Sequence, residues 1–281
     1  MKRQAMIYLS VFLIIILLIF LLFNQRSIQT ITFFPIDNYT TFEKASTSLS
    51  LIDSFNNKSL KWETYSKSNQ PAYLRQDVSL LFGNGKLKGV KSKWKDHTDT
   101  IYMEEDLSAN KNIKWEAISY HHGELQYSST NINSVQDMSH EYLYVIPSKN
   151  NKLLSFQKPD TNYEYKAQQR IDLLVKQELI VHWQELAKHY NISLTDYNLI
   201  PFTSLYKYNN SPLPNMTTGQ TEKVIGKLWE GVYKNYIILA ANTKHEQLTG
   251  LEPIILIDKN QSHIIVLFEL NNKKDMLIQH I

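Results

Sequence analysis

The stretch from Val78 to Val90, VSLLFGNGKLKGV, places Asn84 and Gly85 between an apolar run and an alternating segment. Asn and Gly tolerate the positive φ angles that a two-residue hairpin turn requires. The stretch therefore predicts two antiparallel strands joined at this dipeptide. The letters Gly-Asn-Gly-Lys also suggest a phosphate loop, but its spacing is absent and no Ser or Thr follows Lys86.

Strand patterns continue over residues from about 61 to 147, and IKWEAISYHHGELQYS (113–128) is one of them. One face of this segment would take Ile113, Trp115, Ala117 and Ser119. Gly123 interrupts the alternation, which predicts that residues 121–124 form the tip or bend of a hairpin. Adjacent strand side chains point to opposite faces, so His121 and His122 are poorly placed to share a metal. We expect an exposed turn with one histidine packed on the sheet.

The segment TFEKASTSLSLIDSF (41–55) has apolar residues at spacings of three and four. This stripe consists of Phe42, Ala45, Leu49, Ile52 and Phe55. Thr40 and Glu43 fit a capping box at its start. We therefore expect a short amphipathic helix here.

After Pro147 the pattern changes to a helical period. Thr161 and Glu164 fit a capping box, and a long helix is expected to run to Tyr190. A second helix is indicated by apolar pairs every four residues from Val224 to Ile237. The segment between them contains three prolines, so it should lack regular structure, and long loops of this kind are often functional.

The C-terminal run PIILIDKNQSHIIVLFEL (253–270) predicts a hairpin, and residues 276–281 can add a last strand. Strands, then two long helices, then a C-terminal β-hairpin favour an α+β fold with a largely antiparallel sheet. We divide the exported chain into a juxtamembrane linker (24–60), a strand-rich part (61–150) and a helical part with the hairpin (151–281). Residues 61–281 can form a single domain.

The N-terminus predicts a membrane anchor. Residues 5–23 carry no charge, and as a helix they would extend about 28 Å, close to the roughly 30 Å apolar core of a bilayer. Lys2 and Arg3 precede this span in a short tail, residues 1–4, which the positive-inside rule places in the cytoplasm. The bulk of the chain would then be extracytoplasmic. No small-x-small site follows the span, which favours a retained signal anchor over a cleaved signal peptide.

Composition excludes several classes of function. The chain has no Cys, so disulfides, thiol nucleophiles and Cys-ligated zinc are excluded. A large exported domain without Cys is typical of a bacterial cell envelope that does not rely on disulfides. The net charge is +3, and Lys2 and Arg3 supply most of it. The exported part is thus nearly neutral, and the chain has no recognised nucleic-acid motif, so we expect no nucleic-acid partner. We also expect no cofactor.

No catalytic residue can be assigned from the motifs. His182 and His189 flank Glu185 on the first long helix, but they are seven residues, or about 10.5 Å, apart. They cannot both reach one zinc ion, so no metal site is expected. Two acidic clusters could supply the carboxylate pair of a glycan hydrolase, although such clusters are usually solvated loops. They are Asp96, His97 and Asp99, and Glu104, Glu105 and Asp106.

Two sets of residues are candidates for binding. Lys91, Lys93 and Lys95 would share one face of a strand, where they could bind an anionic membrane or wall polymer, or only form a charged edge. Aromatic residues in the proline-rich segment could form a platform for a protein partner or a glycan. These are Phe202, Tyr206 and Tyr208.

These features predict a single-pass, N-in, extracytoplasmic α+β protein without catalytic activity. It would bind a protein partner or an envelope component near the membrane. One alternative is a carboxylate-based envelope glycan hydrolase. Another is a membrane sensor or assembly subunit, although the span has no Gly-x-x-x-Gly for close helix pairing.

Overall fold

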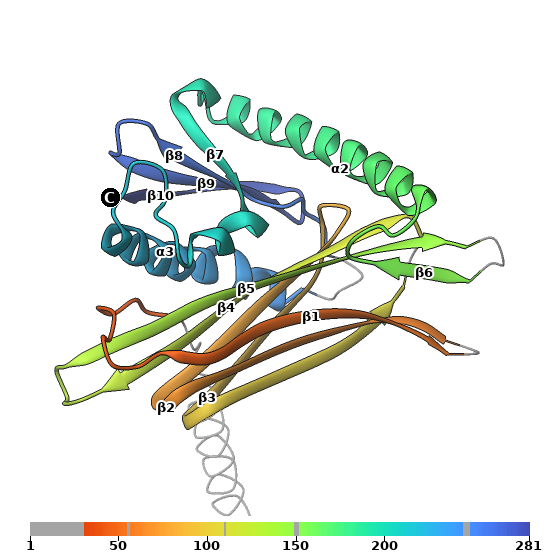
Figure 1. The fold of residues 1–281 in the computed structure, drawn as a ribbon. Helices are drawn as coiled ribbons and strands as arrows, with labels where there is room; N and C mark the ends of the chain where they lie inside the picture. The colour runs from red at the N-terminus through yellow and green to blue at the C-terminus, as the bar shows by residue number, and fades with distance from the viewer. Residues whose placement is uncertain (1–30, 55–56, 110, 149–151, 244–247) are drawn as a thin grey trace, which may run out of the picture. The chain divides into compact units, whose positions relative to one another are not determined.

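The computed structural model describes residues 31–54, 57–109, 111–148, 152–243 and 248–281. The chain from Ile31 to Ile281 forms one compact unit, and its strands make two antiparallel sheets (Figure 1). The first sheet has the order β1-β2-β4-β5-β6, with β3 paired to β2. Its strands are β1 (Phe42–Ser54), β2 (Asn57–Gly83), β3 (Lys86–Ser108), β4 (Ile113–Gln126), β5 (Ile132–Pro147) and β6 (Leu153–Phe156).

The turn predicted at Asn84 and Gly85 is confirmed. Both residues have positive φ angles, 50° and 75°, and Gly83 pairs with Lys86 across the turn. A Cβ on Gly85 would lie 3.0 Å from the Leu179 side chain, so close packing also favours glycine here. The two strands that this turn joins are the longest in the molecule among the described residues.

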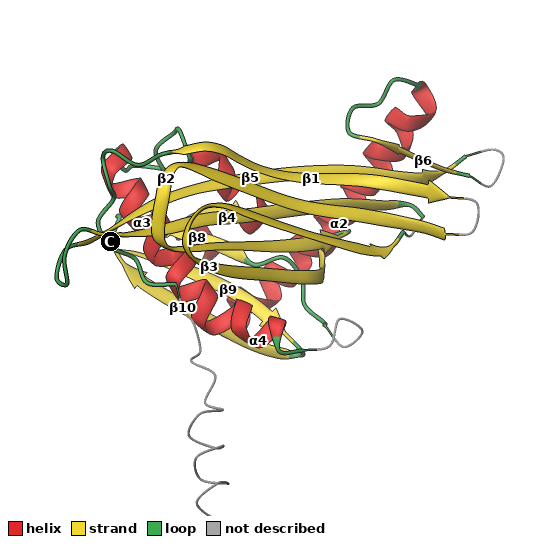
Figure 2. Cartoon of the chain, turned by 90° about the horizontal axis from the view of Figure 1, so that it is seen from below, coloured by secondary structure: helices red, strands yellow, loops and turns green. Residues whose placement is uncertain are grey.

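The β2–β3 hairpin folds back on itself. Its register shifts between Lys67 and Ala72, and His97 on β3 has a positive φ of 48° close to the same bend. Before the bend, β2 pairs with β1, and after it β2 pairs with β4. Figure 2 shows both strands turning back together at one end. The first sheet therefore has two layers, and Trp62 donates a hydrogen bond of 3.1 Å to Ser79 of its own strand.

The helix expected at residues 41–55 is wrong, because this segment is β1. It pairs antiparallel with β2 from Phe42↔Ser68 to Ser54↔Asn57. Its Ser and Leu residues also alternate with a period of two, which buries Thr47 and Leu49 and exposes Ser48. Pairing with the long strand β2 selects the period of two, so the segment forms a strand.

The predicted order of later elements is confirmed: helices come next, and a strand hairpin closes the chain. The helices are α2 (Asn162–His189), α3 (Thr218–Val232), a π turn (Tyr233–Ile237) and α4 (Ile238–Ala241). The second sheet has the order β10-β9-β8-β7, built from β7 (Tyr197–Pro201), β8 (Ile254–Asp258), β9 (His263–Leu270) and β10 (Lys273–His280). The segment expected to be irregular thus contains β7, together with two 3₁₀ turns, Leu194–Asp196 and Phe202–Tyr208.

Packing arranges these elements in layers. One face of the second sheet contacts α3, and α3 also contacts the first sheet through Trp229 and its neighbours. The other face of the second sheet contacts the C-terminal half of α2 through Leu186 and Ala187. The N-terminal half of α2 packs through Ile171 on Tyr144 and Phe156 of the first sheet. Helix α2 therefore bridges both sheets.

Candidate functional site

The space inside the folded first sheet has an apolar half and a polar half. Side chains of β4 alternate into it, and the inward series is Trp115, Ala117, Ser119 and His121. The apolar half includes Leu49, Leu60, Trp62, Leu81, Trp115 and Val145. The polar half includes Thr47, Arg75, Asp77, Ser79, Ser119, His121 and Ser139. A cluster of polar groups this large inside a sheet is the most distinctive feature of the described chain.

The exposed turn expected at residues 121–124 is wrong. His121 and His122 lie in the middle of β4 and are fully buried, at 0% and 1% exposure. A Cβ on Gly123 would lie 3.0 Å from Cδ of Arg75, so this glycine makes room for the arginine rather than for a turn. The two histidines do face opposite ways, because His121 contacts Asp77 whereas His122 stacks on Tyr120.

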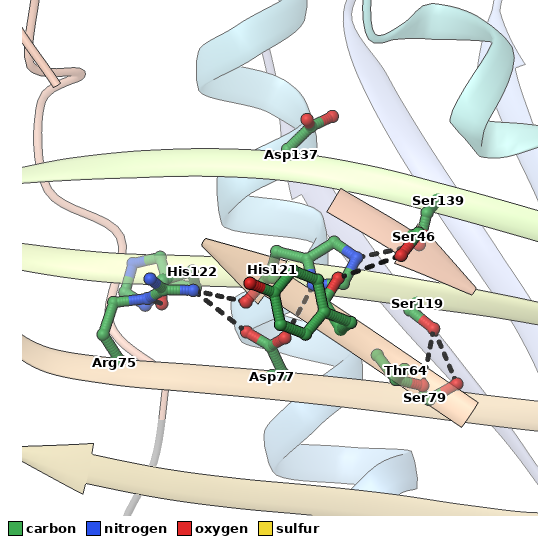
Figure 3. Close-up of polar contacts among 12 residues, drawn as sticks. Ser46, Thr64, Arg75, Asp77, Ser79, Ser119, His121, His122, Asp137 and Ser139 are labelled. Carbon is green, nitrogen blue, oxygen red and sulfur yellow. Dashed lines mark hydrogen bonds and ion pairs between the residues drawn. The ribbon is translucent and has the colours of Figure 1, made fainter. Parts of the chain in front are cut away.

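Three residues from three strands form a Ser–His–Asp arrangement (Figure 3). The Ser139 hydroxyl lies 2.8 Å from Nε2 of His121, and Nδ1 of His121 lies 2.7 Å from Oδ2 of Asp77. The positions come from β5, β4 and β2, where Asp77 pairs with His121 and His121 pairs with Asp137. This is the order of contacts found in hydrolytic triads.

A longer chain of hydrogen bonds leads into this trio. Successive partners are 2.6–3.1 Å apart, in the order Trp62, Ser79, Ser119, Thr47, Ser139, His121 and Asp77. The Trp62 indole can only donate, and each hydroxyl has one proton to pass on. In the arrangement where each hydroxyl donates to the next partner, donation runs from Trp62 toward His121, which accepts at Nε2. In that arrangement Nδ1 of His121 donates to Oδ2 of Asp77.

Arg75 closes the network at the other end. Its guanidinium is fully buried and lies 3.4 Å from Oδ1 of Asp77. It also donates to the hydroxyls of Ser66 and Ser68 and to the carbonyls of Asp99 and His122. Burial lowers the pKa of Arg75, while the charge of Asp77 opposes this shift. Asp77 therefore contacts both the buried guanidinium of Arg75 and the imidazole of His121.

The environment of Ser139 does not suit a nucleophile. Its Oγ also contacts Thr47 at 2.6 Å, and β5 directs the Ser139 N–H toward β4. The backbone groups of successive strand residues point to opposite sides. The N–H and C=O of Ser134 point away from β4, toward Pro35 and Asp37, so those of Ser139, five positions along, point toward β4. None of the cavities described for this part of the chain is lined by Ser139 or His121. The trio therefore has the contacts of a triad, with Ser139 partly exposed, but neither Ser139 nor His121 lines a described cavity.

A second, half-buried polar cluster lies on the opposite face of β4. Glu116 contacts Lys114 and His140, each at 2.9 Å. Burial raises the pKa of Glu116, but hydrogen bonds and charges from its two partners outweigh burial and lower it to about 2. Burial and then the charge of Glu116 raise the pKa of Glu252 to about 7. Carboxylates with separated pKa values can act as acid and base, but neither lines a described cavity.

The three predicted lysines lie on β3 beside the fold of the hairpin. The Lys91 ammonium donates to the Trp62 carbonyl at 2.6 Å and lies 3.8 Å from the Trp62 ring. Burial lowers the pKa of Lys91 to about 8. Lys93 donates to the Tyr102 carbonyl at 2.9 Å, and Lys95 is exposed. Both contacts therefore join the two layers of the folded hairpin: Lys91 of β3 to Trp62 of β2, and Lys93 to Tyr102 on the other side of the bend in β3.

The three predicted aromatic residues occupy different places. Phe202 is fully buried against Trp229, and Tyr206 stacks on His140 with ring centroids 4.3 Å apart. Tyr208 lines a cavity of about 470 Å³ beside β5, together with Asp137. A platform role stays a prediction for Tyr206 and Tyr208, which are the two partly exposed rings.

The remaining candidates are dispersed. His182 is buried, whereas Glu185 and His189 are exposed on the same helix. Across the described ranges, no group of three or more His, Asp or Glu side chains is placed to hold a metal ion. Both acidic clusters lie within β3 rather than in loops between strands.

Helix α2 has two apolar faces. Its buried face consists of Ile171, Leu179, His182, Leu186 and Ala187. On roughly the opposite side, Leu173, Leu174, Ile180 and Val181 are 56%, 55%, 37% and 55% exposed. A groove of about 930 Å³ runs beside this outward face and is lined by Tyr163, Arg170, Leu174 and Val181. Figure 1 shows the helix along an outer side of the molecule.

The predicted membrane span, residues 5–23, lies outside the described residues. Among the residues that the structure does describe, no helix is both long and apolar enough to cross a membrane. A scan against models of protein families matches none to this chain, and searches of curated proteins and of solved structures find no match either.

Proposed function

We propose that this chain is a non-enzymatic binding or assembly factor, anchored through residues 5–23 and working outside the cytoplasm at a bacterial cell envelope. The observation that carries the binding role is the outward apolar face of α2. The four aliphatic side chains of this face extend over about two helical turns. Such a run is unusual on the solvent side of a helix whose other side already packs on a core. Contiguous exposed apolar surface typically marks an interaction site.

The buried networks support the same proposal. The polar chain from Trp62 to Asp77 in the first sheet is satisfied by protein groups. Such networks stabilise a unique core, and they need no ligand to satisfy them. The carboxylate-hydrolase alternative was based on the two acidic clusters that lie on β3. Glu116 and Glu252 are a further pair of carboxylates, and neither of them lines a described cavity.

Site-specific photocrosslinking in the native membrane tests the binding role. A photoreactive residue at Leu174, which is outward and apolar, should give protein adducts on illumination. The same residue at Lys176, which is exposed two positions along on another side of α2, is the matched control. Adducts at Leu174 and few at Lys176 are expected. Lipid adducts alone, or no adducts at either position, would contradict the proposal.

Topology is tested separately. Protease added to intact protoplasts should digest the domain and leave a small membrane fragment, because the charge pattern places the C-terminus outside. Full protection of the domain would refute the extracytoplasmic assignment. That result would leave the binding role of α2 open to the crosslinking test.

A further inference from the structure

The outward face of α2 has a sequence that complements itself when reversed. One flank of this face reads Arg170, Leu174, Val181 and Glu185, because Arg170 precedes Leu174 by one turn and Glu185 follows Val181 by one turn. The other flank reads Gln169, Leu173, Ile180 and Gln184. Both flanks are therefore polar, apolar, apolar and polar, and both are centred within half a residue of Gln177.

We infer that this face binds the same face of α2 in a second copy of the chain, as an antiparallel helix pair. This inference names the partner of the surface in the proposed function and rests on that proposal. A two-fold axis through Gln177, perpendicular to both helices, makes the interface isologous. Such an axis brings each flank of one helix against the same flank of the other.

The contacts follow from helix geometry. Leu174 lies three residues before the axis and Val181 lies four after it, so the two meet within one residue rise of about 1.5 Å. Leu173 and Ile180 meet in the same way on the other flank. The two Gln177 amides face each other at the axis, and a single polar layer in an apolar seam specifies register.

Charge selects the antiparallel orientation. Arg170 lies seven residues before the axis and Glu185 lies eight after it, so each guanidinium lies level with a carboxylate of the other copy. Both side chains are exposed. A parallel, in-register pair would instead bring Arg170 level with Arg170 and Glu185 level with Glu185, so both attractive pairs would be lost.

Single-cysteine crosslinking of the full chain tests the pair directly, because the natural chain has no Cys. Q177C should form a disulfide-linked dimer when membranes are oxidised with copper phenanthroline. K176C is the matched control, since it is exposed and adjacent but points away from the seam. A strong dimer band for Q177C and a weak one for K176C are expected, whereas equal bands would overturn the proposal.

Orientation is tested with two tagged chains. L173C and I180C, mixed in one membrane, should crosslink to each other, and each alone should crosslink poorly. Efficient crosslinking of L173C alone would indicate a parallel pair and would refute the two-fold at Gln177. R170E should reduce the Q177C dimer band, and adding E185R to the same chain should restore it.

The outcomes separate this inference from the proposed function. Photocrosslinks from Leu174 to a different protein, with no Q177C dimer, would overturn self-association and leave the binding role intact. Loss of all protein adducts from Leu174 would overturn both. A dimer that survives R170E unchanged would remove the charge argument and, with it, the assigned orientation.

Discussion

Glu252 gives the sharpest quantitative prediction, because its carboxyl group is buried without a cation in contact. It is 4% exposed, and its Oε1 accepts hydrogen bonds of 2.7 Å from both the N–H and the hydroxyl of Thr203. Burial and the neighbouring charge of Glu116 raise the pKa of Glu252 from 4.5 to about 7. The E252Q variant keeps the shape and the acceptor oxygen but cannot ionise.

The sign follows from proton binding. Between pH 4.5 and about 7 the folded chain holds a proton at Glu252 that the unfolded chain has lost, so stability falls as pH rises through this window. The contribution is complete below 4.5 and is lost above about 7. At about 1.4 kcal/mol per pKa unit, the loss is roughly 3 kcal/mol. E252Q should avoid this loss.

Thermal unfolding of the full chain in detergent, followed by tryptophan fluorescence, measures the effect. At about pH 8, E252Q should unfold roughly 6–12 °C above the wild type, and near pH 4.5 the two should be close. E178Q, on the exposed side of α2, is the control and should not change the pH dependence. An E252Q variant that is no more stable at high pH would refute the assigned environment of Glu252.

Three further predictions test the fold. D77N should destabilise the chain by about 3–5 kcal/mol in urea unfolding at neutral pH, because it removes the carboxylate beside the buried Arg75; an unchanged midpoint would argue against that ion pair. G226A should cost about 1–3 kcal/mol and expose residues 31–41 to protease, since a Cβ there would overlap the Phe33 ring; unaltered cleavage would show that this segment does not pack on α3. G85A should cost about 1 kcal/mol by thermal melting, because its φ of 75° is strained for alanine and Leu179 lies close; a stabilised variant would contradict the turn.

Local chemistry made several elements predictable. Asn84 and Gly85 form the turn that their tolerance of positive φ indicated, and Thr161 with Glu164 forms the capping box of α2. The segment of β1 was misassigned because its Ser and Leu residues fit periods of both 3.6 and two. Pairing with β2 decides between them, and this pairing is a tertiary contact that no local window contains.

The polar trio could not be predicted for a related reason. Asp77 and His121 are 44 residues apart, and His121 and Ser139 are 18 apart. Only the registers of β2, β4 and β5 bring them together, and those registers follow from pairing along whole strands. One signal was available. The series Trp115, Ala117 and Ser119 continues to His121 without a break if Gly123 is taken as a strand residue that admits Arg75.

The bend of the β2–β3 hairpin also determines which side chains of β2 face the interior. From Lys67 to Ala72, β2 advances five residues while β3 advances two, from Thr98 to Thr100. The excess of three is odd, so the side chains of β2 that face the interior change from even to odd numbers across the bend. Trp62 and Ser79, whose side chains meet inside, illustrate the change.

Length variation at this bend is therefore restricted by parity. Adding or deleting one residue between Ser68 and Pro71 would turn one arm of β2 inside out, exposing Trp62 or Asp77 and burying charged neighbours such as Lys61. A change of two residues would preserve the inward set. Natural or engineered versions of this bend should accordingly differ in length by even numbers.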